Sequence, residues 1–365
     1  MPTAPARILI INPGSTTTKV AVFADGREEL SREIPVRRED LAAARTTLDQ
    51  LPFRLRLVEA ELAAAGLAIS DLAAVVGRGA PLAPVPAGTY RINPAMLADA
   101  RGDRYIDHVS RLGCLIAEAL ARPHGLPAFI ADPVSVDEYD PISRVSGLPG
   151  MPRRSLTHAL NIKAAARRFA AESGRPYEEL NLVVAHLGGG ISVAVHHRGR
   201  MIDSVDANGE GPMSPERSGA LRVDDLVDLC FSGQHDRAGL KRLLTRGSGL
   251  AGHLGTADAI EIEKRIAAGD EKARVAYEAM AYMVAKHIAG LAAAVSGRVD
   301  AVILTGGLAR SGMLVEQISA RVGFLGRVAV YPGENEMLSL CLAAMRVLSG
   351  AEKPRVYPGG EEDEA

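Results

Sequence analysis

The amino-acid sequence predicts an α/β protein built from two duplicated βββαβαβα halves. Three observations lead to this prediction. The chain has 365 residues, a length typical of two domains. A pattern of apolar and polar residues near the N-terminus returns about half a chain later, and the same order of predicted strands and helices follows each copy. We expect the two halves to face each other across a cleft lined by their polar turns.

The repeated pattern is a strand, a polar turn and a second strand. In the first copy an apolar run stops at Asn12, passes a Pro-Gly turn, four hydroxyl residues and Lys19, and becomes apolar again at residues 20–23. In the second copy, residues 182–195, the apolar run stops at His186, passes three glycines and becomes apolar again. Both copies therefore predict a hairpin whose turn carries the polar groups.

The elements after the first copy alternate between helix and strand. Helices are predicted where apolar residues recur with a 3.6-residue spacing, as at Leu55, Val58 and Leu62. Strands are predicted where short apolar runs lie between turn residues. The first half continues with a third strand at 28–36, a helix at 40–66, a strand at 73–77, a helix at 106–122 and a strand at 127–131.

The second half repeats this order with one insertion. A helical stretch at 224–268 is inserted before a long helix at 271–296. The other predicted elements are a third strand at 200–206, a strand at 301–305, a helix at 311–323, a strand at 327–331 and a last helix at 336–349. The corresponding domains are residues 1–135 with 340–365, and residues 136–339.

Composition excludes several classes of protein. A net charge of −2 with 24% charged residues offers no field that would favour nucleic acid or an anionic membrane. The longest apolar helix is interrupted by Lys286 and His287, so we expect a core helix and no membrane span. Cys114, Cys230 and Cys341 are far apart, which argues against a disulfide framework or a cysteine zinc site. We expect a cytoplasmic protein, because the N-terminus enters a strand and lacks the layout of a signal peptide.

The first polar turn differs from a Walker-type phosphate loop. That loop needs a glycine directly before its lysine and a helix after it, whereas Thr18 precedes Lys19 here and a strand follows. Backbone N–H groups and hydroxyls gathered in such a turn can form a concave anion site. A polar hairpin tip with nothing bound remains an equally good interpretation of these residues alone.

The motifs of the two turns resemble a known family. Asn12–Lys19 and His186–Gly190 are similar to signatures of the acetate and butyrate kinase family, and the residues of the remaining motifs are most similar to its butyrate kinase branch. The resemblance runs from residue 7 to residue 350. It implies the actin-like ATPase, or ribonuclease H-like, fold and the reversible, ATP-dependent phosphorylation of a short-chain fatty acid, butyrate, to an acyl phosphate. Acetate, propionate or a branched-chain acid is the alternative substrate.

This reaction makes particular demands on the protein. A carboxylic acid with a pKa of roughly 4 to 5 is already ionised at neutral pH and needs no general base. The difficulty is that one anion must approach another, so catalysis should consist of charge neutralisation and alignment. Arginine is suited to hold carboxylate and phosphate oxygens. The resemblance assigns this work to Arg78 and Arg217.

The resemblance also implies a set of catalytic and metal-binding residues. His186 should donate a hydrogen bond to the phosphoryl group, and His158 should orient the same site. Asp132 and Glu336 should lie near Mg²⁺, the expected metal. On the residues alone, Asp132 could instead cap a turn or a helix, and His158 could instead be a structural residue.

The expected contacts to ATP or ADP come from polar and glycine turns, where the backbone can approach phosphates. A formal GxGxxG match at 247–252 follows a predicted helix, so we interpret it as chance. The expected nucleotide and phosphate contacts are Asn12, Ser15, Thr17, Lys19, Gly188, Gly189, Gly190, Gly306 and Gly307.

Two further positions bear on the acyl chain. Acetate kinases carry valine two residues after the first arginine and phenylalanine directly before the first histidine, whereas this chain has Ala80 and Thr157. Both differences remove side-chain volume, so the pocket is expected to fit a four-carbon acid.

We expect the partners to be small molecules, namely the carboxylate and the nucleotide, and by family analogy a homodimer or larger homo-oligomer. An alternative of a different class is a nucleotide-switched binding protein, which would need a peptide-binding or DNA-binding appendage. We see no such segment in the sequence.

Overall fold

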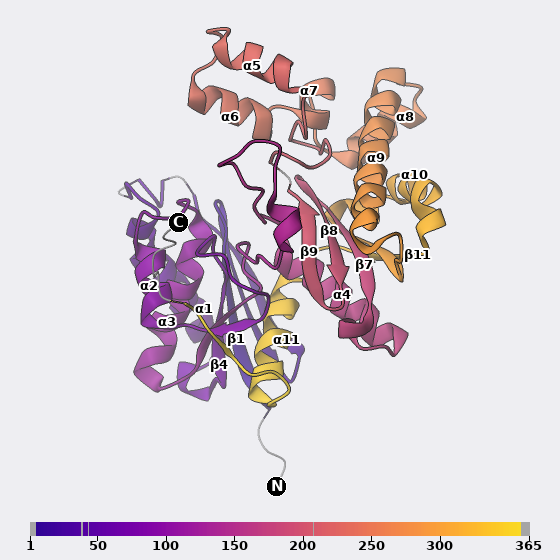
Figure 1. Cartoon of the computed structure of the whole chain (residues 1–365). Helices are drawn as coiled ribbons and strands as arrows, with labels where there is room; N and C mark the ends of the chain where they lie inside the picture. Colours follow the sequence, from indigo (N-terminus) through magenta and orange to yellow (C-terminus); the bar gives the residue numbers. More distant parts are fainter. Residues whose placement is uncertain (1–4, 38, 43, 207, 359–365) are drawn as a thin grey trace. The chain divides into compact units, whose positions relative to one another are not determined.

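The computed structural model describes residues 5–37, 39–42, 44–206 and 208–358. The chain forms two compact units (Figure 1). The first unit consists of Met1–Val136 and Asn335–Ala365, and the second of Asp137–Glu334. The last helix of the chain therefore belongs entirely to the first unit, whereas the sequence analysis divided it at residue 340.

The first unit is a seven-stranded sheet with helices packed against it. The strand order is β12-β5-β6-β4-β1-β2-β3, in which β1 is antiparallel to β2 and parallel to β4. Its strands are β1 Arg7–Pro13, β2 Thr17–Ala24, β3 Arg27–Pro35, β4 Ala74–Arg78, β5 Thr89–Arg91, β6 Ala128–Ala131 and β12 Arg355–Val356. Its α-helices are α1 Leu51–Ala64, α2 Pro94–Arg101, α3 Leu112–Ala121 and α11 Glu336–Leu348.

The second unit is a five-stranded sheet in the order β11-β10-β7-β8-β9, which repeats the order β6-β4-β1-β2-β3 of the first unit. Its strands are β7 Asn181–Leu187, β8 Ile191–His197, β9 Arg200–Val205, β10 Ala301–Gly306 and β11 Arg327–Pro332. Its α-helices are α4 Ala159–Ser173, α5 Val223–Phe231, α6 Arg237–Arg246, α7 Gly249–Leu254, α8 Ala259–Ala267, α9 Glu271–Ala292 and α10 Gly312–Val322.

Each sheet is buried because its central strands are continuous apolar runs. Residues 8–11 of β1 and 301–304 of β10 have no exposed surface. Strands that are covered on both faces consist of such continuous apolar runs, which is why the sequence analysis located them correctly. Across the described residues, no helix is both long enough and apolar enough to cross a membrane.

Two predicted helices are shorter than expected. The helix predicted at 40–66 begins only at Leu51, with a proline in its first turn. Before it, the Asp49 carboxylate accepts the N–H groups of Arg45 and Thr46 at 2.8 Å each, which stabilises a turn in place of helix. Residue 43 of that prediction lies outside the described residues. The helix predicted at 106–122 begins at Leu112, after a short 3₁₀ turn at Val109–Arg111.

The final helices of the two repeats exchange units. Helix α4 follows β6 along the chain but packs on β7 and β10 of the second unit. Helix α11, drawn in yellow in Figure 1, follows β11 but packs on β1, β4 and β6 of the first unit. Its buried face includes Leu340, Cys341 and Ala344. The sequence analysis assigned no element to α4, nor to α2, β5 and β12.

Strand β4 and helix α3 approach each other through a pair of glycines. A Cβ atom on Gly77 would lie 2.2 Å from the carbonyl oxygen of Gly113, and a Cβ atom on Gly113 would lie 2.5 Å from the carbonyl oxygen of Arg78. Because both obstacles are backbone atoms, a larger residue could fit only if the helix moved away from the strand. This contact fixes the end of β4, where Arg78 lies.

Gly77→Ala is therefore expected to destabilise the protein by about 1–3 kcal/mol through overpacking. Gly290→Ala is the matched control, because Gly290 is exposed in α9 and an added Cβ would meet no atom within 4 Å. That control is expected to stabilise by about 0.5–1 kcal/mol through helix propensity. Urea unfolding followed by circular dichroism measures both, and a Gly77→Ala midpoint at or above wild type would contradict the packing argument.

Candidate active site

The β1–β2 turn of the first unit presents its polar side chains on one face. Asn12 lies directly opposite Lys19 in the antiparallel register, and Thr17 is two residues from Lys19, so all three share a face. Thr18 points to the other face and is fully buried. A hollow of about 430 Å³ opens on this side, lined by the turn residues together with Arg78, His108 and Glu336.

Glu336 joins the ends of two strands at this hollow. One carboxylate oxygen accepts a hydrogen bond from Asn12 Nδ2 at 2.7 Å, and the other pairs with Arg78 Nη1. The Arg78 side chain is only 12% exposed, so this ion pair is shielded from water. Glu336 is also the first residue of α11, where the helix dipole favours a negative charge. The returning helix thus contributes directly to the polar cluster.

Lys19 and Ser15 occupy the open part of the hollow. Lys19 Nζ lies 3.8 Å from Glu33 Oε2, and both side chains are about half exposed. An exposed ion pair of this length contributes little free energy, so the ammonium can exchange that partner for an anion. The Ser15 side chain is exposed in the same turn. Both placements are compatible with the phosphate contacts that the sequence analysis expected.

Asp132 has a structural partner. Its Oδ1 accepts the N–H of Gly88 at 2.7 Å, and its own N–H donates to the Gly88 carbonyl at 3.0 Å. The residue is buried with a positive φ of 38°, and it does not line the described hollow. At least one of its carboxylate oxygens therefore holds the chain after β6, the turn-capping role that the sequence left open.

His108 is a candidate that the sequence analysis missed. Its Nδ1 accepts the N–H of Ser110 at 3.2 Å, which leaves Nε2 to carry the proton of the neutral ring, and the residue lines the hollow. Burial lowers the pKa of His108 below its usual value, and the charge of Arg78 lowers it further. The ring is therefore a neutral donor at pH 7. A single histidine before a 3₁₀ turn has no sequence pattern that could have identified it.

In the second unit, two histidines stack beside the glycine turn. The rings of His158 and His186 have centroids 4.0 Å apart and planes 18° apart. Asn161 Nδ2 donates to His186 Nδ1 at 2.9 Å, so the proton of a neutral His186 lies on Nε2. That Nε2 faces Glu334 Oε1 at 3.3 Å. His158 Nδ1 lies 2.9 Å from Ser192 Oγ. His186 is thus oriented to donate a hydrogen bond at the turn.

Arg217 lies against the same turn. A Cβ atom on Gly190 would lie 2.5 Å from Arg217 Cζ, so the glycine makes room for the guanidinium. Arg217 Nη1 donates to Asn208 Oδ1 at 2.9 Å, but its buried Nε has no hydrogen-bond partner among the residues that the structure describes. Burial lowers the pKa of this arginine. No carboxylate among the described residues lies within ion-pair distance of it. An unsatisfied buried donor of this kind indicates a missing acceptor.

The inserted helices support the Arg217 loop. Gly249 has a φ of +62°, and a Cβ atom on it would lie 1.9 Å from the Ser214 carbonyl oxygen. The N–H groups of Leu250 and Ala251 donate to the carbonyls of Ser214 and Pro215 at 3.2 and 2.8 Å. The GxGxxG match therefore follows helix α6 and serves close packing, in agreement with its interpretation as chance.

A second hollow, of about 300 Å³, lies between the glycine turns of the second unit. It is lined by Gly188, Gly189 and Gly307, with Glu216 and Glu334 at its edges. Gly306, at the end of β10, packs closely against β7: its φ is +94°, and a Cβ atom on it would lie 2.4 Å from the Leu187 carbonyl oxygen. Glycines at these positions would allow the backbone of β7 and β10 to approach a ligand closely.

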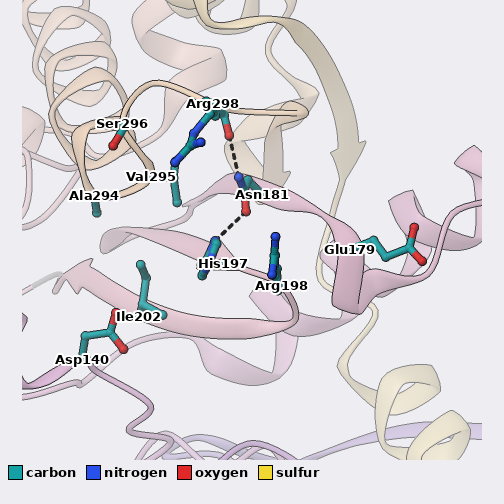
Figure 2. A pocket seen from close by; sticks show the side chains of 10 residues that line it. All are labelled: Asp140, Glu179, Asn181, His197, Arg198, Ile202, Ala294, Val295, Ser296 and Arg298. Carbon is teal, nitrogen blue, oxygen red and sulfur yellow. Dashed lines mark hydrogen bonds between the residues drawn. The ribbon is translucent and has the colours of Figure 1, made fainter.

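A third hollow, of about 420 Å³, lies at the opposite end of β7 (Figure 2). There His197 Nδ1 bonds to Asn181 Oδ1, and Asn181 Nδ2 donates to the carbonyl of Arg298, each at 2.8 Å. Its guanidinium groups are accompanied by the carboxylates of Asp140 and Glu179. This mixed lining, far along the strand from His186, is not the arrangement that an anionic substrate requires.

The two expected acyl-pocket residues belong to different units. Ala80 is 1% exposed and lies in the hydrophobic core of the first unit. Thr157 is buried in the second unit, and its Oγ1 lies 3.8 Å from Met201 Sδ.

The oxygen donors of the first unit could hold Mg²⁺ only together with phosphate oxygens and water. Within the described residues, no group of three His, Cys, Asp or Glu side chains is placed to hold a metal ion. Glu336 and the hydroxyls of Ser15 and Thr17 line one hollow and are hard oxygen donors. Mg²⁺ usually takes one or two carboxylates and completes its shell with phosphate oxygens and water, so these residues are compatible with it.

Comparison with known proteins places this geometry in a family. Residues 152–340 match the model of the acetokinase family. The chain is 46% identical to "Probable butyrate kinase 2" of Caldanaerobacter subterraneus subsp. tengcongensis over 351 residues, 96% of this chain and 99% of that protein.

Solved structures agree on the fold. An acetate kinase from Porphyromonas gingivalis superposes with a TM-score of 0.76 at 20% identity, over 94% of this chain and all of that one. A propionate kinase from Francisella tularensis gives 0.76 at 17% identity, over 93% and 98%. The α/β fold predicted from the repeat, and the actin-like class that the family resemblance implied, are confirmed. The chain belongs to the acetokinase family and is a carboxylate kinase.

Proposed function

We propose that this carboxylate kinase phosphorylates butyrate with ATP, forming butyryl phosphate and ADP in a reversible reaction. The observation that supports phosphoryl transfer most directly is the buried Arg217 guanidinium beside the glycine turn, whose Nε finds no acceptor in the described part of the chain. The choice of butyrate rests on the 46% identity to a probable butyrate kinase. Acetate, propionate and branched acids are the competing substrates.

The proposed chemistry needs charge compensation more than proton transfer. A carboxylate oxygen of butyrate attacks the γ-phosphorus of ATP, and the bond from that phosphorus to the β–γ bridging oxygen breaks, leaving its electron pair on ADP. No proton moves, because the nucleophile is already ionised. Arg78 and Arg217 would hold the substrate carboxylate and the transferring phosphoryl group, and His186 Nε2–H would donate to a phosphoryl oxygen.

The phosphates would be held by the two turns. Asn12, Ser15, Thr17 and Lys19 supply donors in the first unit, and Gly188–Gly190 with Gly306 and Gly307 supply close backbone approach in the second. When bound, Mg²⁺ neutralises phosphate charge, and Glu336 is the carboxylate best placed to take part in holding it. Asp132 would act beside Glu336 mainly by fixing the chain after β6. His158 would hold the plane of His186 by stacking.

Butyrate is expected to exceed acetate in kcat/KM by roughly tenfold or more, because each buried methylene contributes about 0.8 kcal/mol. Ala80→Val and Thr157→Phe should each lower the butyrate-to-acetate ratio by filling space near the end of the acyl chain. Trapping the acyl phosphate with hydroxylamine, for acetate through valerate and isobutyrate, measures the ratio. Because both positions are buried, the melting temperature of each variant must be measured alongside. A wild-type preference for acetate would refute the choice of butyrate.

Arg217→Ala is expected to lower kcat by roughly 10²–10³-fold, the usual cost of removing a donor to a developing charge. Arg222→Ala is the matched control: it lies five residues further along, its side chain is 78% exposed, and it forms long ion pairs with Asp224 and Asp225, at 4.0 and 3.7 Å. The control should retain wild-type turnover. Steady-state kinetics with saturating ATP and butyrate measures kcat of both variants. A wild-type kcat in Arg217→Ala would contradict the proposed role of Arg217.

A further inference from the structure

Arg54 is a fully buried arginine beneath the β1–β2 turn. It lies in the first turns of α1 and has no exposed surface. Its Nη2 donates to the carbonyl of Gly14 at 2.9 Å, and its Nη1 donates to the carbonyl of Thr17 at 3.1 Å and to Thr18 Oγ1 at 2.7 Å. Its Nε and Nη2 donate to Gln50 Oε1 at 3.1 and 3.0 Å. One guanidinium therefore holds both sides of the turn.

All of these acceptors are neutral. Among the described residues, no carboxylate lies within ion-pair distance of Arg54. Arg111, a second buried arginine of the same unit, does have such a partner, with Nη1 3.0 Å from Asp107 Oδ1. Burying a cation without a counter-charge is costly. A neutral side chain could satisfy a carbonyl at lower cost, so the retained charge calls for an explanation beyond folding.

The hydrogen bonds also orient the backbone of the turn. In a trans peptide the C=O of one residue and the N–H of the next point in opposite directions. Because Arg54 holds the Gly14 carbonyl toward the interior, the Ser15 N–H points away from it, on the exposed side of the turn. Backbone N–H groups turned outward above a buried positive charge form a receptor for an anion.

We propose that Arg54 is a positioning residue for phosphate binding, which sets the shape of the Gly14–Thr18 turn and supplies an uncompensated positive charge beneath it. This inference rests on the proposed function, in that the anion is taken to be the phosphate chain of ATP. Arg54 does not line the hollow, so it acts through the turn without touching the substrate.

Arg54→Met tests the proposal, because methionine keeps much of the apolar stem and removes the charge and the donors. The KM for ATP is expected to rise about tenfold or more, since hydrogen bonds from a charged group are the strong ones. The KM for butyrate should change less than twofold. The dissociation constant of a non-hydrolysable ATP analogue, measured by calorimetry, should rise with the KM for ATP. A purely structural role would lower the melting temperature without this selective loss.

Two further variants complete the experiment. Arg111→Met is the matched control: its guanidinium bonds the carbonyl of Ala100 and pairs with Asp107, so it should lose stability and keep both KM values. Arg54→Lys keeps the charge but cannot span Gly14, Thr17 and Thr18 with one planar fork, so its affinity for the analogue should lie between those of wild type and Arg54→Met.

The outcomes separate the two proposals. Wild-type analogue affinity in Arg54→Met overturns the role of Arg54, and if that variant fails to fold, wild-type affinity in Arg54→Lys does so. Wild-type protein that binds the analogue but forms no acyl hydroxamate from any short-chain acid refutes the proposed function. In that case a selective loss of analogue affinity in Arg54→Met still supports a role for Arg54 in phosphate binding.

Discussion

The junction of Glu336 with Asn12 and Arg78 is the interaction on which the site of the first unit depends. It brings together the end of β1, the end of β4 and the first residue of a helix that lies more than 250 residues further along the chain. That meeting is possible only because α11 returns to pack on β1 and β4. The polar cluster is therefore a consequence of the exchanged final helices. Residue 334, two positions earlier, faces His186 in the second unit, so one short segment supplies a carboxylate to each site.

Close backbone packing is the second constraint. The two glycines between α3 and β4 hold the strand that ends in Arg78, and Gly190 and Gly249 leave room for Arg217 and its loop. In each case the glycine lies against an element that carries an arginine of the proposed site. The cationic groups are thereby held with little freedom to move, and part of the entropic cost of ordering them is met during folding. The proposed binding of anions would benefit, because it need not immobilise a flexible side chain.

The sequence predicted the parts of the fold that depend on local pattern. Continuous apolar runs identified the central strands, and the repeat identified their order, since buried strands and hairpins are encoded within a few residues. Short elements such as β5 and α2 were missed because their apolar residues are few. The late start of α1, at Leu51, depends on the Asp49 carboxylate accepting backbone N–H groups, a contact that no periodicity reveals. His108 and Arg54 were missed for a related reason: their roles arise from tertiary neighbours, and neither residue stands in a recognisable motif.

The duplicated hairpins show how one backbone plan can carry two kinds of polar group. Asn12 and His186 occupy matching places at the ends of β1 and β7, the central strands of matching order in the two sheets. In the first copy a buried arginine holds a turn made of hydroxyl residues, which have side chains to offer. In the second copy the turn consists of three glycines and has no side chains of its own, so the polar groups around it come from other segments. Asn161 orients His186, and the 214–217 loop carries Arg217. The repeat conserves the position of the turn, while the contacts beneath and around it determine what each turn can bind.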